Sequence, residues 1–215
     1  IGYAELLLLK DLDDDTKKKI KKINTEALRA ANIVKNLQTF ARQDRYEKEY
    51  VDINRIIENA IDTKGHEFAS NNIQVVKELE KNMPWTMGDA LHLQYAFLAI
   101  IGNAIHAMEE ISNRRVFAVK AKLITAGDKL EGVRISDQIS KKVIRVSFND
   151  NGVSIPEDII GKIFDPFFTT KPVGKGAGLG LSAAYGIIKE HNGVIYAESK
   201  EGVGTTITVE LPVKT

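Results

Sequence analysis

Residues 149–193 read NDNGVSIPEDIIGKIFDPFFTTKPVGKGAGLGLSAAYGIIKEHNG, and this stretch decides the fold. Its acid-and-glycine segment, Asp150 to Ser154, follows a run at 143–149 that predicts a β-strand. Four glycines then fall between Gly174 and Gly180, directly before a predicted helix. Glycines allow close backbone approach, and a helix start offers free N–H groups to a phosphate. Taken separately, the first segment also fits a plain turn and the second a flexible linker.

The sequence on either side of this stretch predicts helices and strands in mixed order. We expect helices at 51–70, 90–110, 156–164 and 181–191, and strands at 72–77, 115–124, 143–149, 194–199 and 205–211. In the first of these helices, the isoleucines at 53, 56, 57 and 61 face inward. The polar residues 132–142 show no pattern that identifies an element. This order predicts an α+β fold in which helices cover one sheet.

The first part of the chain has a helical rhythm of its own. IGYAELLLLK is amphipathic, DLDDD interrupts it at 11–15, and Asp15 or Thr16 is expected to cap the helix that follows. Small or apolar residues then recur in steps of three and four, at Ile20, Ile23, Ala27, Ala30, Val34, Leu37 and Ala41. Two helices bury little by themselves, so we expect this hairpin to pack against another copy. The polar run from Gln43 to Tyr50 suggests two domains, at 1–46 and 47–215.

Composition excludes several classes of protein. The chain has 215 residues, 43% of them hydrophobic and 27% charged, which is ordinary for a globular protein. It has no cysteine, so disulfides, zinc-thiolate sites and thiol nucleophiles are excluded. A net charge of +1 gives no field for nucleic acid, and the run TKKKIKK is interpreted as a solvated helix face rather than a nucleic-acid patch. Apolar runs such as Leu6 to Leu9 are far too short for a membrane span, so none is predicted.

Asn103 is a conspicuous amide within the apolar segment AIIGNAIHAM, residues 99–108. A buried amide needs hydrogen-bond partners, which neighbouring backbone groups could supply. Alternatively, its oxygen is a hard, neutral ligand of the kind that Mg²⁺ accepts beside substrate phosphates. The residue alone does not decide between these two interpretations.

Five motifs taken together are far more specific. They are LQYAFLAIIGNAIHAM (93–108), NDNGVSIPE (149–157), IFDPFFTTK (163–171), GKGAGLGL (174–181) and GVGTTITVELP (202–212). In this order they resemble the ATP-binding catalytic domain of sensor histidine kinases, in the GHKL superfamily shared with DNA gyrase B, Hsp90 and MutL. The resemblance spans Val51 to Val213 and implies a two-layer α/β sandwich of the Bergerat type. Upstream, IGYAELLLLK and the helix ending in LQTFARQ resemble the family's dimerisation and phosphotransfer hairpin, half of a dimeric four-helix bundle.

The resemblance implies a role for each matching residue. Asn103 would coordinate Mg²⁺ beside the triphosphate of ATP, and Asp150 would accept a hydrogen bond from the adenine amine, as an acceptor-only carboxylate can. Gly152 would leave room for the base, and Lys171 would meet phosphate charge. The lid would be anchored by Phe164, Phe167 and Phe168, and the phosphates would be wrapped by Gly174, Lys175, Gly176, Gly178, Leu179, Gly180 and Leu181. Either Thr205 or Thr206 would line the adenine pocket.

The chain departs from the family pattern at several positions. Ser154 stands where a second glycine is usual, Ala99 where an Asn or Glu is common, and His106 where a Lys or Gln is frequent. Ala99 weakens the case for a general base there, and His106 could meet phosphate if protonated or lie on the helix surface. The family's phosphoacceptor histidine, in an H-E-x-x-x-P-like box, is expected upstream of Ile1 in a longer polypeptide. His66 precedes a glutamate but lacks the proline, and His92 and His191 are expected to be structural.

These observations support three hypotheses. The leading one is the kinase core of a cytoplasmic two-component sensor, which binds Mg-ATP, dimerises through the hairpin and contacts a response regulator; its parent could carry a membrane anchor elsewhere. The second is an ATPase of the gyrase or Hsp90 kind, against which FDPFFTTK and the hairpin argue. The third is a non-catalytic dimeric nucleotide-binding module, with Ala99 and Ser154 as signs of lost activity.

Overall fold

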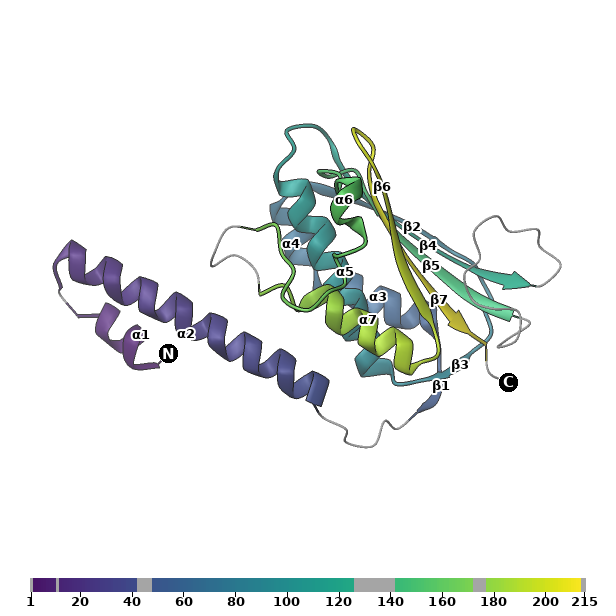
Figure 1. Ribbon diagram of the computed structural model, residues 1–215, viewed down its shortest axis with the longest axis horizontal. Helices are drawn as coiled ribbons and strands as arrows, with labels where there is room; N and C mark the ends of the chain where they lie inside the picture. The colour runs from purple at the N-terminus through teal and green to yellow at the C-terminus, as the bar shows by residue number, and fades with distance from the viewer. Residues whose placement is uncertain (1, 11, 42–47, 126–141, 172–176, 214–215) are drawn as a thin grey trace.

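The computed structural model describes residues 2–10, 12–41, 48–125, 142–171 and 177–213; in the second helix, side chains are described as far as Ala31, except Arg29. Figure 1 shows a helical hairpin beside a sheet that is covered by helices. The hairpin consists of α1 (Gly2–Leu8) and α2 (Asp14–Ala41). The sheet domain begins at the short strand β1 (Glu49–Val51). The predicted boundary at 46/47 lies outside the described residues.

A five-stranded mixed sheet forms one layer of the domain. Its order is β2-β4-β5-β7-β6, with β2 parallel to β4 and all other neighbours antiparallel. The strands are β2 (Ile73–Leu79), β4 (Arg115–Thr125), β5 (Lys142–Asp150), β6 (Val194–Lys200) and β7 (Gly204–Pro212). A separate ribbon pairs β1 with β3 (Thr86–Gly88). Nearly all of the polar segment 132–142 lies outside the described residues.

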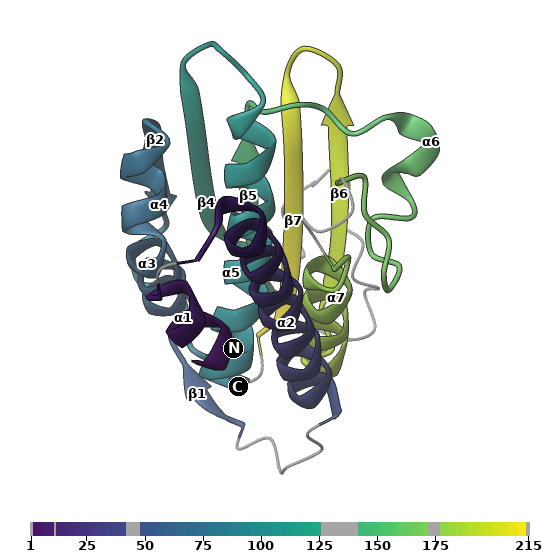
Figure 2. The ribbon, with the colours of Figure 1, turned by 90° about the vertical axis from the view of Figure 1, so that its left-hand side faces the viewer.

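Helices of the domain cover one face of this sheet, as Figures 1 and 2 show. They are α3 (Ile53–Thr63), α4 (Gly65–Ser70), α5 (Ala90–Glu109) and α7 (Gly180–Glu190), and the single turn α6 (Glu157–Ile160) follows β5. A chain of aromatic rings fills the interface, with centroids 5.4 Å apart for Phe68 and Phe117 and 5.3 Å apart for Phe97 and Phe148. The α+β sandwich expected from the sequence is therefore confirmed.

The central helix α5 is apolar on most of its surface because it is a core helix. Asp89 caps its start by accepting the N–H of His92 at 3.0 Å. Its buried side chains pack against α3, α7 and the sheet. Among the described residues it is also the one helix whose length and composition would suit a membrane span. Because α5 packs against α3, α7 and the sheet, burial inside the domain accounts for its apolar composition.

Three local predictions were wrong in detail. The helix predicted at 51–70 is two helices that meet at Lys64 and Gly65, and Val51 pairs with Thr86 in the β1–β3 ribbon instead. Glycine favours a helix poorly, which accounts for the break. The helix predicted at 156–164 is the shorter α6. Asp13, rather than Asp15 or Thr16, caps α2, since its Oδ1 accepts the N–H of Thr16 at 2.9 Å.

Candidate functional site

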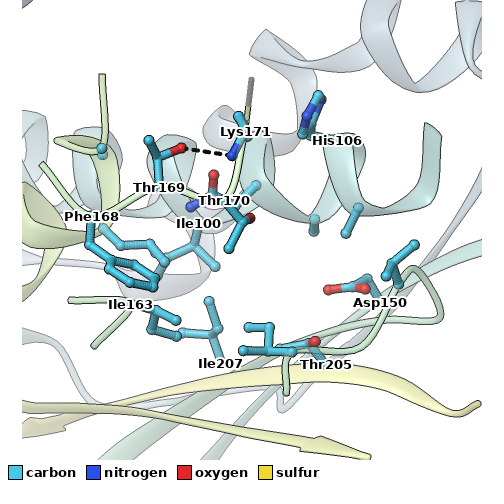
Figure 3. A pocket seen from close by; sticks show the side chains of 18 of the residues that line it. Ile100, His106, Asp150, Ile163, Phe168, Thr169, Thr170, Lys171, Thr205 and Ile207 are labelled. Carbon is cyan, nitrogen blue, oxygen red and sulfur yellow. Dashed lines mark hydrogen bonds between the residues drawn. The ribbon is translucent and has the colours of Figure 1, made fainter. Parts of the chain in front are cut away.

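A cavity of about 570 Å³ opens between α5, the ends of β5 and β7, and residues of the segments 153–171 and 177–181. Figure 3 shows Asp150 and Thr205 together at one end, and Ile163 and Phe168 at the other. His106 and Lys171 lie on the side opposite Thr205 and Ile207 in this view. The walls are mostly apolar, with a few polar groups that converge on the space, which is the usual character of a small-molecule site.

Asp150 ends β5 and points its carboxylate into the cavity (Figure 3). Its residue is 5% exposed, and Oδ1 accepts the N–H of Gly152 at 2.9 Å. Burial raises the pKa of this carboxyl from its usual 3.8 to about 6, although hydrogen bonds from the backbone of Gly152 and Thr205 act in the opposite direction. Among the described residues no cation pairs with it. A buried acceptor of this kind is suited to a neutral N–H donor in the cavity.

The loop after Asp150 needs glycine at one position and makes use of serine at another. A Cβ on Gly152 would lie 2.5 Å from the backbone carbon of Ala107 on α5, so only glycine fits there. Val153 then donates its N–H to the Ala107 carbonyl at 3.0 Å. Ser154, where the family pattern has glycine, donates its hydroxyl to the carbonyl of Lys200 at 2.7 Å. The serine therefore ties this loop to β6 as well as lining the cavity.

Asn103 and His106 line the cavity from neighbouring turns of α5. His106 is partly exposed, and its Nδ1 lies 3.0 Å from Oε2 of Glu109. Ala99, one turn before Asn103, is outside the cavity lining and packs on the core near Gly180. Among the described residues no group of three His, Cys, Asp or Glu side chains could hold a metal ion. An ion at Asn103 would therefore need further oxygen ligands from a bound molecule.

The described residues between α6 and α7, 161–171 and 177–179, form the outer wall of the cavity. Phe168 lines it, whereas Phe164 packs on the core and against the ring of Tyr185, with centroids 5.9 Å apart. Phe167 was expected to anchor this segment, but it is 65% exposed and has a φ of +67°. Gly178 has a φ of +65° and a Cβ there would lie 2.4 Å from the carbonyl carbon of Phe167, so glycine is required.

Three of the predicted glycine-loop residues, Gly174, Lys175 and Gly176, lie outside the described part of the chain. Gly178, Leu179, Gly180 and Leu181 all line the cavity at the start of α7. Lys171 lines it as well, and burial lowers the pKa of its ammonium group, with Glu109 and Glu110 acting in the opposite direction. The structure therefore brings together a helix start, a partly buried lysine and a buried carboxylate.

Strand register decides between the two threonines. Thr205 pairs with Asp150 across β5 and β7 and lines the cavity. Thr206 points to the opposite face, where its Oγ1 accepts a hydrogen bond from Nδ2 of Asn149 at 2.7 Å. Sequence reasoning did not single out Ile207, although it follows Thr205 by two residues and alternation places both on one face. It also missed Ile100, Ile159 and Thr170, whose lining positions depend on tertiary packing.

Comparison with known proteins assigns this fold and cavity to a family. Residues 88–215 match the sequence profile of the family described as "Histidine kinase-, DNA gyrase B-, and HSP90-like ATPase". That match covers more than half of the chain, and the chain belongs to this family. Within it, the relatives described next place the chain on the sensor histidine kinase branch.

The curated relatives are longer proteins. "Sensor kinase CckA" of Brucella abortus is 32% identical over 90% of this chain and 20% of its own length. "Sensor histidine kinase ZraS" of Escherichia coli is 30% identical over 87% of this chain and 36% of its own. "Sensory histidine kinase/phosphatase NtrB" of Azospirillum brasilense is 30% identical over 99% of this chain and 51% of its own length. The chain thus spans from a fifth to about half of the length of these relatives.

Solved histidine kinases share the fold. The catalytic domain of ThkA superposes with a TM-score of 0.61 at 27% identity, covering 77% of this chain and 95% of that one. ThkA in complex with the response regulator TrrA superposes with a TM-score of 0.69 at 26% identity, covering 99% of this chain and 56% of that one. Full-length ShkA in complex with AMPPNP superposes with a TM-score of 0.71 at 19% identity, covering 100% of this chain and 42% of that one. At this identity the likeness shows the fold alone. The second comparison includes the hairpin as well as the domain.

Proposed function

We propose that this chain is the kinase core of a two-component sensor, which binds Mg-ATP in the cavity and directs the γ-phosphate to a histidine for relay to a response regulator. The observation that carries this proposal is Asp150, a buried carboxylate at the end of β5 that faces the cavity and that no cation of the described residues pairs with. An ionised, acceptor-only group at that position matches the exocyclic amine of adenine and opposes the carbonyl of guanine.

The remaining lining groups fit the rest of the nucleotide. Gly152 lets the loop after Asp150 pack closely on α5, where a Cβ would lie 2.5 Å from the backbone carbon of Ala107. Gly178 to Leu181 bring the start of α7 to the cavity, where free backbone N–H groups suit a phosphate. Lys171 supplies positive charge, and the Asn103 oxygen would be a neutral protein ligand for Mg²⁺, whose other ligands would come from phosphates and water. Bound Mg²⁺ would offset charge on the phosphates while these residues position them.

The hairpin is the proposed site of assembly. Tyr3, Leu6, Leu9 and Ile23 all expose most of their surface, and a second copy would cover them in a four-helix bundle. ThkA, which is similar over the whole hairpin and domain, has been solved with a response regulator, and we propose a partner of that kind here. We also propose that this core works in the cytoplasm, where its nucleotide and its relay partner are found.

One experiment separates this function from the other two hypotheses. The chain is incubated with γ-labelled Mg-ATP, alone and with a separate hairpin that carries an H-E-x-x-x-P box, and acid-labile label and released phosphate are both measured. A kinase core labels the added hairpin and not itself, because none of its four histidines stands in such a box. Phosphate release without an acceptor would indicate an ATPase. Nucleotide binding with neither outcome would indicate a regulatory module.

A further inference from the structure

Three polar side chains form one row across the sheet at the cavity end. Asp150 of β5 is paired with Thr205 of β7, and Thr205 is paired with Ser199 of β6. Paired positions in a sheet point to the same face, which here is the face that carries the cavity. Asp150 and Thr205 line that cavity, side by side in Figure 3, and Ser199 lies behind Thr205, partly buried.

The bonds of Ser199 define which way each hydroxyl in the row points. Ser199 Oγ accepts the N–H of Ile155 at 2.8 Å and lies 3.0 Å from both the Gly204 carbonyl and Oγ1 of Thr205. A carbonyl can only accept, so Ser199 donates its single hydroxyl hydrogen to the Gly204 carbonyl. The hydrogen between Ser199 and Thr205 must then belong to Thr205. Oγ1 of Thr205 is left with lone pairs, and no hydrogen, to offer to the cavity.

The backbone around Gly204 keeps this arrangement in place. Gly204 has a φ of +121°, and a Cβ there would lie 2.0 Å from the carbonyl oxygen of Asp150. The start of β7 is therefore pressed against the end of β5, which fixes the Gly204 carbonyl relative to Ser199. On the other side, Ile155 belongs to the loop that Ser154 ties to Lys200. Ser199 is thus held by one donor and one acceptor that belong to backbone.

We propose that Ser199 is a positioning residue for nucleotide selection: it turns the Thr205 hydroxyl into an acceptor, so that Thr205 and Asp150 together present two acceptors to the base. This inference rests on the proposed function and goes beyond it by assigning specificity to a residue outside the cavity lining. An amino group has two hydrogens and satisfies two acceptors, whereas a ring carbonyl in the same place satisfies neither. Ser199 therefore raises the preference for a 6-amino purine over a 6-oxo purine.

The test compares ATP with ITP, which carries a 6-oxo group in place of the amine, by calorimetric titration of the full chain. We expect Ser199→Ala to free the Thr205 hydroxyl to rotate and donate, and to narrow the ATP-to-ITP affinity ratio about tenfold, the worth of one buried hydrogen bond. Ser199→Cys fills the same space with a weak donor and acceptor and should narrow the ratio in the same direction. It carries the test if the alanine variant does not fold.

A double-mutant cycle assigns the effect to Thr205. In a Thr205→Val background, which has no hydroxyl to orient, Ser199→Ala should leave the ratio unchanged. Ser147→Ala is the matched control, because Ser147 pairs with Thr208 at 3.3 Å on the opposite face of the same sheet. The proposal is overturned if Ser199→Ala lowers both affinities equally, or if its effect on the ratio persists without the Thr205 hydroxyl. A wild-type chain that binds no ATP would instead refute the proposed function.

Discussion

The hairpin and the sheet domain place their apolar side chains in opposite environments. In α1 no residue is buried, and Leu6 is 60% and Ile23 63% exposed. In the domain, Phe97 and Leu93 of α5 are completely buried, as are Phe117 of β4 and Ile57 of α3. Burying a large apolar side chain contributes roughly 1.5–3 kcal/mol, so the two regions differ greatly in what holds them together. The domain has its own core, whereas the hairpin presents a surface that a partner would complete.

Truncating the core should give the largest effect. Phe97 has no exposed surface and contacts the ring of Phe148, so Phe97→Ala should lower the free energy of unfolding by about 3–5 kcal/mol. Leu6→Ala, at an exposed position, should change it by less than about 0.5 kcal/mol. Urea unfolding followed by circular dichroism at low protein concentration measures both. A comparable loss for Leu6→Ala would show that the hairpin surface is already covered.

The buried carboxyl of Asp150 in the cavity should lower the stability of the domain at neutral pH. Burial raises the pKa of Asp150 to about 6, so between roughly pH 4 and 6 the native chain keeps a proton that the unfolded chain has lost. The contribution of Asp150 to the free energy of unfolding therefore falls as pH rises through that window. Above the window, its raised pKa lowers the free energy of unfolding by about 3 kcal/mol. Asp150→Asn stays neutral and should raise the melting temperature of the nucleotide-free chain at pH 8 but not at pH 4.

The same variant should weaken nucleotide binding. An amide in place of the carboxylate can direct a donor at the adenine amine, and an unmatched buried polar group costs roughly 1–3 kcal/mol. Titration with ATP at pH 8 should show this loss together with the gain in stability. Equal affinities for wild type and variant would remove Asp150 from the binding site, whatever happens to the melting temperature.

A charge on the hairpin should act on association and leave the domain intact. Ile23→Asp places a carboxylate on the apolar face of α2 and should raise the dimer dissociation constant by about tenfold or more. Thr25→Asp introduces the same charge two residues further on, on another side of the helix, and should have little effect. Sedimentation velocity over a concentration series measures both. A wild-type chain that stays monomeric at micromolar concentration would contradict the proposed role of this face.

The smallest effect is expected at the start of α2. Asp13 accepts both the N–H and the hydroxyl of Thr16, at 2.9 and 2.7 Å, so Asp13→Ala should fray the first turn. Asp15 only pairs with Lys19 on the surface, and Asp15→Ala should leave the helix start intact. Amide hydrogen exchange of the first turn of α2 distinguishes them. Fraying in the Asp15 variant alone would show that Asp15, one of the two caps expected from the sequence, is the cap instead of Asp13.

Much of the fold could be predicted from the sequence because its main elements carry strong local periodicity. The helix α5 and the strands β5 and β7 lie within a residue or two of their predicted bounds. The β1–β3 ribbon was missed because Val51 finds its partner, Thr86, far along the chain, and a three-residue strand has no periodicity of its own. The end of α3 was missed because a single glycine, Gly65, is a weak signal inside an apolar pattern.

The candidate site was predictable where a motif names a residue and less so where packing decides. Asp150, Gly152 and Asn103 could be singled out by their motifs; Asp150 and Asn103 line the cavity, and Gly152 packs on Ala107 of α5. The choice between Thr205 and Thr206 needed the strand register, and the outward turn of Phe167 needed its backbone angle. Ser199 has no local signature, since a hydroxyl in a strand becomes informative only through its bonds to the paired strand β7 and to the distant Ile155.

The strands β5 and β7 are adjacent in the sheet, yet everything from Asn151 to Val203 lies between them in the chain. That intervening stretch holds α6, the outer wall of the cavity, α7 and β6. The entropy of closing a long loop grows only with the logarithm of its length, so doubling it costs about 0.6 kcal/mol. Insertions or deletions in the outer wall should therefore cost the central strand pair little. The part of the molecule that covers the cavity can vary in length while the sheet beneath it stays the same.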